Sequence, residues 1–190
     1  MKFSDGRMYT VKQLSRSHYH WNEIQQAINR RTKPGMGPFN LKELYSVKWT
    51  TKPFPWSYYT EFQPNRRWFY HGTTQQTIIK ILDDGFKVGP VYTAKSGRIL
   101  GDGVYATYHT NKGKMYATDG YVISVMVYAP NTLVFHPSQQ LDQNTINNAS
   151  RKYDAIEVRT DVVVNGWKMV NHEICVFDTR RVIPRFILKI

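Results

Sequence analysis

Three short segments hold the side chains of this chain that could do chemistry. They are residues 70–73 (Tyr-His-Gly-Thr), 101–105 (Gly-Asp-Gly-Val-Tyr) and 172–178 (His-Glu-Ile-Cys-Val-Phe-Asp), which supply a histidine, a tyrosine and a glutamate in that order. A glycine after a histidine lets the backbone approach a ligand closely. A carboxylate held in a partly dry cleft can stabilise positive charge that develops during a reaction. Together the segments predict a ligand-binding cleft, whereas His-Gly-Thr alone is a weak signal.

Hydrophobic periodicity predicts the elements that must position these residues. Residues 67–70 read as a strand that leads to His71, and Thr73 is a residue type that can open the helix after it. An apolar stripe over residues 78–82 has helical spacing and ends at Gly85, a residue typical of helix C-caps. The histidine is therefore expected at a junction between a strand and a helix.

Strands dominate the second half of the chain, with few helices between them. The pattern predicts strands at 121–128, 132–135, 154–159, 173–177 and 185–189, a hairpin with an Asn-Gly turn at 162–169, and helix and loop at 138–152. This arrangement predicts an α+β fold rather than a doubly wound parallel sheet.

The first third of the chain has fewer regular patterns. Residues 21–28 have helical apolar spacing, and the helix is expected to end at Arg31, before a Pro-Gly pair. Residues 40–43 (Asn-Leu-Lys-Glu) resemble a capping box and predict a short second helix. Residues 53–64 read as an extended aromatic loop, because two prolines near its start disfavour helix.

Composition limits the class of protein. With 190 residues the chain can bury a real core, and one domain is the default expectation. The single cysteine, Cys175, excludes an internal disulfide and leaves too few soft ligands for a structural zinc site, so no metal is predicted. No apolar run reaches the length of a membrane span, and residues 1–6 turn polar too early for a secretory signal. We therefore expect an intracellular protein of the cytoplasm or nucleus.

Positive charge is concentrated near the N-terminus. The formal net charge is +12, and residues 1–70 hold 12 Lys and Arg against 4 Asp and Glu, a net of +8. Such a segment, rich in Tyr and Trp, could contact a polyanion by attracting phosphates and stacking on bases. The alternative is a solvated positive surface that keeps the protein soluble.

The ordered set of motifs resembles the catalytic domain of poly(ADP-ribose) polymerases. The matching segments are 70–73, 82–86 (Leu-Asp-Asp-Gly-Phe), 101–116, 173–178 and the closing segment 182–189. The resemblance covers about residues 65–190, which leaves residues 1–64 as a basic, aromatic-rich extension packed on the core domain. It implies an ADP-ribosyltransferase fold of two abutting, mostly antiparallel β-sheets with flanking helices and an NAD⁺-binding cleft. It also implies transfer of ADP-ribose from NAD⁺ to a protein or nucleic-acid acceptor.

The resemblance assigns residues to NAD⁺. His71 would bond the adenosine ribose, Gly72 would hold the nicotinamide amide through its backbone, and Thr73 would contact the ribose. Tyr105 and Tyr116 would sandwich the nicotinamide ring. The faces of aromatic rings are electron-rich, so two of them attract a nicotinamide ring that carries positive charge.

Glu173 would be the catalytic carboxylate, with His71 and Tyr105 completing the catalytic set. Cleavage of the nicotinamide–ribose bond leaves positive charge on the sugar, which a carboxylate stabilises. Strand alternation predicts that Glu173 shares a face with Cys175, opposite the face of Ile174.

Two alternatives remain. NAD-dependent RNA 2′-phosphotransferases share the fold and a His-Gly-Thr sequence, but they depend on arginines in the cleft rather than on a tyrosine–glutamate pair. The other alternative is a nucleic-acid-binding module on a degenerate transferase fold. Gly113 keeps it open, because many relatives have a serine there whose hydroxyl bonds the carboxamide, a contact worth about 1 kcal/mol.

Overall fold

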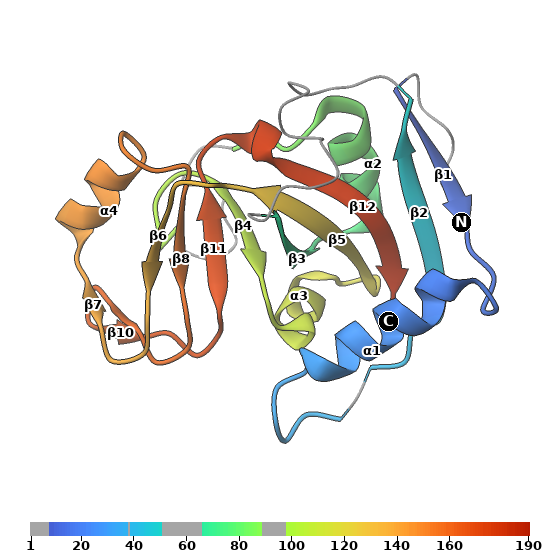
Figure 1. The fold of residues 1–190 in the computed structure, drawn as a ribbon, viewed down its shortest axis with the longest axis horizontal. Coiled ribbons are helices and arrows are strands. Elements are labelled where there is room, and N and C mark those ends of the chain that lie inside the picture. Colours follow the sequence, from blue (N-terminus) through green and yellow to red (C-terminus); the bar gives the residue numbers. More distant parts are fainter. Residues whose placement is uncertain (1–7, 38, 51–65, 89–97) are drawn as a thin grey trace.

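The computed structural model describes residues 8–37, 39–50, 66–88 and 98–190 (Figure 1). Its helices are α1 (Tyr19–Arg30), α2 (Gln75–Asp84), α3 (Thr110–Tyr116) and α4 (Gln143–Ala149), with a short 3-10 helix at Thr179–Arg181. Its strands are β1 (Tyr9–Gln13), β2 (Glu43–Trp49), β3 (Arg66–Gly72), β4 (Val104–Thr107), β5 (Tyr121–Tyr128), β6 (Thr132–Phe135), β7 (Gln140–Leu141), β8 (Ala155–Val158), β9 (Val163–Val164), β10 (Trp167–Lys168), β11 (Glu173–Val176) and β12 (Val182–Lys189). No helix within these ranges is long and apolar enough to cross a membrane.

Most strands belong to one large sheet. Its order is β1-β2-β12-β5-β3-β4-β11-β8-β6, and β10-β9-β7 form a small second sheet. Neighbours in the large sheet run antiparallel except β6 and β8, which are parallel. The α+β prediction is therefore confirmed.

The large sheet has two halves that meet between β3 and β4. The ladder crosses this junction through one residue pair, Tyr70 and Thr107. By contrast, β3 pairs with β5 along its whole length, Arg66–Gly72. The two abutting sheets expected from the resemblance are thus present as halves, and among the described residues this bridge joins β3 to β4.

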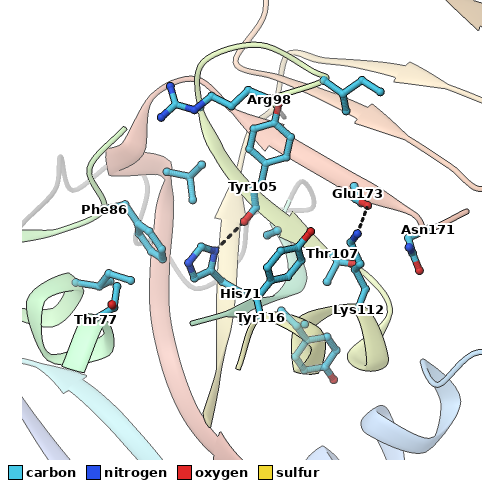
Figure 2. A pocket seen from close by; sticks show the side chains of 18 of the residues that line it. His71, Thr77, Phe86, Arg98, Tyr105, Thr107, Lys112, Tyr116, Asn171 and Glu173 are labelled. Carbon is cyan, nitrogen blue, oxygen red and sulfur yellow. Dashed lines mark hydrogen bonds and ion pairs between the residues drawn. The ribbon is translucent and has the colours of Figure 1, made fainter. Parts of the chain in front are cut away.

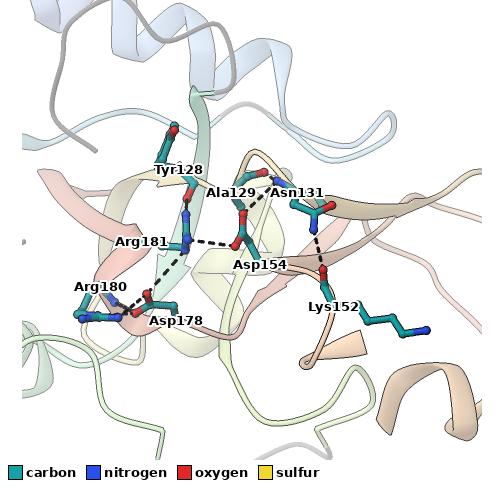
Figure 3. Close-up of polar contacts among 9 residues, drawn as sticks. Tyr128, Ala129, Asn131, Lys152, Asp154, Asp178, Arg180 and Arg181 are labelled. Carbon is teal, nitrogen blue, oxygen red and sulfur yellow. Dashed lines mark hydrogen bonds and ion pairs between the residues drawn. The ribbon is translucent and has the colours of Figure 1, made fainter. Parts of the chain in front are cut away.

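A polar cluster around Arg181 provides a second connection between the halves (Figure 3). The Arg181 guanidinium lies 3.1 Å from Oδ1 of Asp154 and donates to the carbonyl oxygen of Tyr128 at 3.4 Å. The other oxygen of Asp154 accepts a hydrogen bond from the backbone N–H of Asn131 at 3.0 Å. The cluster therefore links the end of β5 in one half to the start of β8 in the other.

Helices α1 and α2 cover opposite faces of the half of the large sheet that consists of β1, β2, β12, β5 and β3 (Figure 1). Ile78 and Leu82 of α2 belong to a buried cluster that includes Phe69 of β3. Ile28 of α1 belongs to a separate buried cluster that includes Tyr70, the next residue of β3. Because adjacent residues of a strand point to opposite faces, the two helices lie on opposite sides of the sheet.

The alternation predicted along β11 is confirmed. Ile174 packs in the cluster beneath α2, whereas Cys175 packs with Ile156 and Leu141 in a third cluster. Glu173 therefore projects on the face of Cys175.

Several predicted elements match the structure closely. The strands predicted at 121–128 and 132–135 are β5 and β6. Asn165 and Gly166 have positive φ values of 48° and 81°, as the predicted hairpin turn between β9 and β10 requires. The helix predicted at 21–28 is α1.

The short helix predicted from residues 40–43 is wrong, because the chain there enters strand β2. β2 pairs with β1 on one edge and β12 on the other. It buries Leu44 on one face and Tyr45 and Val47 on the other. Pairing on both edges and burial on both faces outweigh a local capping preference. The aromatic loop predicted at 53–64 lies outside the described residues.

Candidate active site

A cleft of about 1020 Å³ lies where the two halves of the large sheet meet (Figure 2). Its walls come from β3, α2, β4, α3 and the segment from the β9–β10 turn to β11. Five of the six residues predicted for the site line it: His71, Gly72, Tyr105, Tyr116 and Glu173. The volume is at the upper end of the range for small-molecule sites.

The ring of His71 is held in one tautomer. Its Nδ1 lies 2.8 Å from the carbonyl oxygen of Tyr105, and a carbonyl can only accept, so Nδ1 carries the proton. Burial lowers the pKa of His71, and the hydrogen bond to the Tyr105 carbonyl opposes this only in part. Phe86 packs edge-on against the ring at 5.1 Å. The neutral ring therefore presents Nε2 as a hydrogen-bond acceptor.

Gly72 and Gly113 allow α3 to pack directly on the end of β3. A Cβ atom at position 72 would lie 1.7 Å from the carbonyl oxygen of Gly113 and 3.1 Å from Cβ of Tyr116. A Cβ at position 113 would lie 3.3 Å from Cβ of Tyr70. Close packing of the two backbones sets Tyr116 beside His71, and a serine at 113 would have to fit into tight space.

Glu173 begins β11 and faces Lys112 of α3 across the cleft (Figure 2). Nζ of Lys112 lies 3.7 Å from Oε1 of Glu173, and the glutamate side chain is 14% exposed. Burial raises the pKa of Glu173, while the positive charge and hydrogen bond of Lys112 lower it. The carboxylate is thus poorly solvated but has a cationic partner.

Lys112 was not among the site residues predicted from the sequence. It stands four residues before Tyr116, so both lie on one face of α3, and its ammonium lies 5.2 Å from the centre of the Tyr116 ring. This spacing was the available signal. The pairing of Lys112 with Glu173, 61 positions later in the chain, could not be predicted from this spacing.

The hydroxyl of Tyr105 is anchored to the turn that precedes β4. It accepts from the N–H of Leu100 at 2.8 Å and donates to the carbonyl oxygen of Gly101 at 2.9 Å. Burial raises the pKa of Tyr105. With both bonds made inside the protein, the tyrosine contributes a fixed wall to the cleft and no mobile proton.

Gly103 brings this turn against β11. A Cβ there would lie 2.6 Å from both Sγ of Cys175 and the carbonyl oxygen of Val176. Gly103 therefore permits a close contact between β4 and β11, which places Tyr105 next to the strand of Glu173.

Thr73 is the one predicted site residue that does not line the cleft. The helix-opening residue is Thr74, whose Oγ1 accepts from the N–H of Thr77 at 3.2 Å. The helix begins one residue later than expected, because β3 continues through Gly72.

Positive charge prevails in the cleft. The cationic residues of its lining are Lys80, Lys87, Arg98, Lys112 and Lys168, and the acidic ones are Asp84 and Glu173. Such a balance suits an anionic ligand. Within the described ranges, no three His, Cys, Asp or Glu side chains are grouped to hold a metal ion.

A family model for the poly(ADP-ribose) polymerase catalytic domain matches residues 18–127. The match begins just before α1 and ends in β5, so it includes His71, Gly72, Tyr105 and Tyr116 but stops before Glu173. It also begins earlier than the resemblance in the motifs, which starts near residue 65. No curated protein matches the chain. With the match covering more than half of the sequence, the chain belongs to the family of poly(ADP-ribose) polymerase catalytic domains, ADP-ribosyltransferases that use NAD⁺ as their substrate.

Proposed function

We propose that this protein cleaves the nicotinamide–ribose bond of NAD⁺ and transfers ADP-ribose to a macromolecular acceptor, a protein or a nucleic acid. One observation carries the proposal: the Lys112–Glu173 pair lines the same cleft as His71, Tyr105 and Tyr116. These residues come from β3, β4, α3 and β11, so both halves of the large sheet contribute to the site.

The cleft contains suitable groups for each part of NAD⁺. Tyr105 and Tyr116 would hold the nicotinamide ring between them, with the backbone of Gly72 on its amide. His71 would accept a hydrogen bond from an adenosine ribose hydroxyl through Nε2, the nitrogen that its bond to Tyr105 leaves unprotonated. The cationic lining would attract the pyrophosphate. Thr73 does not line the cleft, so the geometry gives no support to its proposed contact with the ribose.

Glu173 would act on the charge that develops as the bond to nicotinamide breaks. Departure of neutral nicotinamide leaves positive charge on the ribose, and a poorly solvated carboxylate stabilises it better than water does. The same carboxylate can take a proton from an attacking hydroxyl. Lys112 would keep Glu173 ionised, because its charge opposes the effect of burial on the carboxyl pKa.

The cleft gives less support to RNA 2′-phosphotransfer. Among the described residues that line it, Arg98 is the only arginine, and its guanidinium pairs with Asp102 at 2.6 Å. The tyrosines and the glutamate are all present instead.

Mass spectrometry of the products tests the proposal. The full chain is incubated with NAD⁺ labelled in its ADP-ribose part, alone and with an RNA that carries an internal 2′-phosphate. We expect free nicotinamide and labelled ADP-ribose, either free or attached to protein or nucleic acid. Release of ADP-ribose 1″,2″-cyclic phosphate only with the 2′-phosphorylated RNA would assign 2′-phosphotransfer instead. Intact NAD⁺ under all conditions would leave the degenerate binding module.

A further inference from the structure

The turn that follows α1 lies against the start of α3 (Figure 1). It consists of residues 31–33, and we call it the capping turn. The carbonyl oxygen of Arg31 accepts a hydrogen bond from the N–H of Thr110 at 3.3 Å. In return, Oδ1 of Asn111 accepts a hydrogen bond from the N–H of Lys33 at 3.4 Å. Two segments that are far apart in the chain therefore exchange hydrogen bonds in both directions.

The ends of the two helices complement each other. Arg31 is the C-cap residue of α1, and Thr110 is the first residue of α3. A helix carries partial negative charge on its last carbonyls and partial positive charge on its first N–H groups. The side chain of His109, the N-cap residue of α3, makes no capping hydrogen bond, because its Nδ1 accepts from the N–H of His172 at 3.3 Å instead. The capping turn therefore supplies the cap that the side chain of His109 does not.

The side chain of Arg31 anchors the capping turn to the large sheet. Its guanidinium donates to the carbonyl oxygen of Trp68 at 2.8 Å and lies 5.7 Å from the centre of the Tyr70 ring. It also lies 4.5 Å from the centre of the Tyr108 ring. Trp68 and Tyr70 belong to β3, whereas Tyr108 follows β4. The capping turn is thus fixed to both halves of the sheet.

Helix α3 depends on such contacts for its position. It has seven residues, and helices of this length are marginal without tertiary packing. Thr110 and Asn111 are buried, at 0% and 6% exposed, whereas Lys112 and Tyr116 line the cleft. The close packing of Gly113 on β3 fixes the middle of the helix, and the capping turn fixes its start.

The contact between Lys112 and Glu173 is sensitive to the position of this helix start. Lys112 directly follows Asn111, and its Nζ lies 3.7 Å from Oε1 of Glu173. A close charge-assisted hydrogen bond measures about 2.7–2.9 Å, so the contact is already long. A small movement of α3 away from β11 would end it.

We propose that the capping turn is a positioning element of the active site, which holds the start of α3 where Lys112 reaches Glu173. Residues 1–64, expected from the sequence to pack on the core as an extension, thereby help to build the site. This inference rests on the proposed function and specifies what controls its Lys112–Glu173 pair. Lys112 acts on Glu173 directly, and the capping turn acts through Lys112.

Substitution of Asn111 tests this inference without a change of charge. Asn111→Ala removes the acceptor of the Lys33 N–H and leaves Lys112 in place. The pKa of the Glu173 carboxyl is measured by ¹³C NMR on the free protein, and the spectrum of Glu173→Gln identifies its signal. We expect this pKa to rise above the wild-type value, as in Lys112→Gln, because the ammonium that opposes the effect of burial moves away.

A double variant decides whether the effect passes through Lys112. In Lys112→Gln the ammonium is already absent, so the addition of Asn111→Ala should raise the pKa of Glu173 no further. Equal rises from Asn111→Ala with and without Lys112 would mean that Asn111 acts on Glu173 by another route, and the inference would be wrong. An unchanged pKa in either single variant would overturn it as well.

Tyr9→Phe is the matched control. The Tyr9 hydroxyl donates to Oδ1 of Asp83 at 2.6 Å, so this variant removes one hydrogen bond between the N-terminal segment and α2, another helix that borders the cleft. We expect the pKa of Glu173 to stay at its wild-type value. A rise as large as that in Asn111→Ala would show that any loosening of the N-terminal segment has this effect, which contradicts a specific role of the capping turn.

Thr110→Pro is a second and stronger variant. Proline is favoured as the first residue of a helix, and the extended backbone of His109, with φ −87° and ψ 123°, suits a following proline. The variant removes the N–H that bonds to Arg31 and puts a ring carbon against that carbonyl. We expect the pKa of Glu173 to rise at least as far as in Asn111→Ala. The affinity for a nicotinamide mimic should fall by up to about 13-fold, the full loss of stacking on Tyr116.

Urea unfolding shows whether Thr110→Pro is folded. Wild-type values of both the pKa and the affinity in a folded variant would overturn the inference, and if the variant does not fold, Asn111→Ala decides alone. The NMR titrations need no NAD⁺, so they separate this inference from the proposed function. If NAD⁺ is never consumed while the pKa of Glu173 responds as expected, the proposed function has failed and the capping turn still positions Lys112. If NAD⁺ is consumed while the pKa does not respond to Asn111→Ala, the transferase remains and the inference is wrong.

Discussion

Nε2 of His172 lies 2.8 Å from Oε1 of Glu157, a buried carboxylate that also contacts Arg67. Arg67 comes from β3 in one half of the large sheet, whereas Glu157 and His172 belong to the other half. The three side chains thus cross the junction that, in the described part of the chain, the β3–β4 ladder bridges through the pair Tyr70 and Thr107. Since His71 and Glu173 lie on opposite sides of this junction, the contact helps to set the width of the cleft.

The His172–Glu157 contact predicts a pH dependence of stability. Burial and nearby arginines lower the pKa of His172 to about 4, so the folded protein holds it neutral. An unfolded histidine has a pKa of about 6.5, so the unfolded chain binds more protons between these values. Folding stability should therefore fall as the pH decreases from about 6.5 to 4, by up to about 3 kcal/mol from this residue.

Urea unfolding of the wild-type chain and His172→Gln checks this prediction. Gln keeps a hydrogen-bond donor for Glu157 but does not titrate, so the variant should lose less stability across that pH range. His71 and His109 also have lowered pKa values and titrate in both proteins, so the difference reports His172 together with its effect on the pKa of His109. Parallel pH profiles for the two proteins would contradict the assignment of a neutral His172.

Glu173→Gln should abolish or severely reduce ADP-ribose transfer while NAD⁺ binding remains nearly intact. The carboxylate is proposed to act on charge that develops in the transition state, so its loss should affect turnover more than affinity. The expected loss of rate is about a hundredfold or more. Turnover and calorimetric affinity are measured together, with Glu23→Gln, an exposed glutamate of α1, as the control. Near-normal transfer in a folded Glu173→Gln variant would show that another group is the catalytic carboxylate.

Lys112→Gln should shift the acid limb of the pH–rate profile to higher pH. Lys112 lowers the pKa of Glu173, so its removal lets burial raise that pKa further. The ionised carboxylate is then present only at higher pH, which moves the acid limb of kcat/KM upwards. Lys114→Gln is the control, since Lys114 is an exposed residue of the same helix that does not line the cleft. An unchanged limb in Lys112→Gln would mean that the pair does not control ionisation of Glu173.

Tyr116→Ala should weaken binding of NAD⁺ and of nicotinamide mimics. Stacking between aromatic rings contributes about 0.5–1.5 kcal/mol beyond simple burial, which corresponds to roughly 2- to 13-fold in affinity. Calorimetry measures the affinity, and a urea unfolding curve shows whether the variant is folded. Unchanged affinity in a folded variant would remove Tyr116 from the nicotinamide site.

Gly72→Ala should lower both stability and ligand affinity. The new Cβ would lie 1.7 Å from the carbonyl oxygen of Gly113, so α3 must move away from β3 and carry Tyr116 with it. Overpacking of this kind costs about 1–3 kcal/mol. Gly37→Ala is the control, since no atom lies within 4 Å of the Cβ position at Gly37. Wild-type affinity for a nicotinamide mimic in Gly72→Ala would show that the contact between the two glycines does not position Tyr116.

Elements with strong local patterns were predictable from the sequence. The apolar run at 121–128 predicts a buried strand whichever strands it pairs with, and it forms β5. The Asn-Gly turn at 165–166 needs only local backbone preferences, and the structure has it. The helix predicted from residues 40–43 is wrong, because their capping preference is local whereas the pairing of β2 with β1 and β12 joins distant parts of the chain.

Local sequence patterns were sufficient to predict which residue types line the candidate site and the order in which the chain presents them. The glycines near His71 and Tyr105, and the alternation of residues after Glu173, were sufficient for this prediction. The cations that lie near these residues could not be predicted without the folded arrangement of the chain. Lys112 meets Glu173 across 61 positions, and Arg31 meets Tyr108 across 77. Such contacts depend on how helices cross the sheet and on where its two halves join, and neither leaves a periodic signal along the chain.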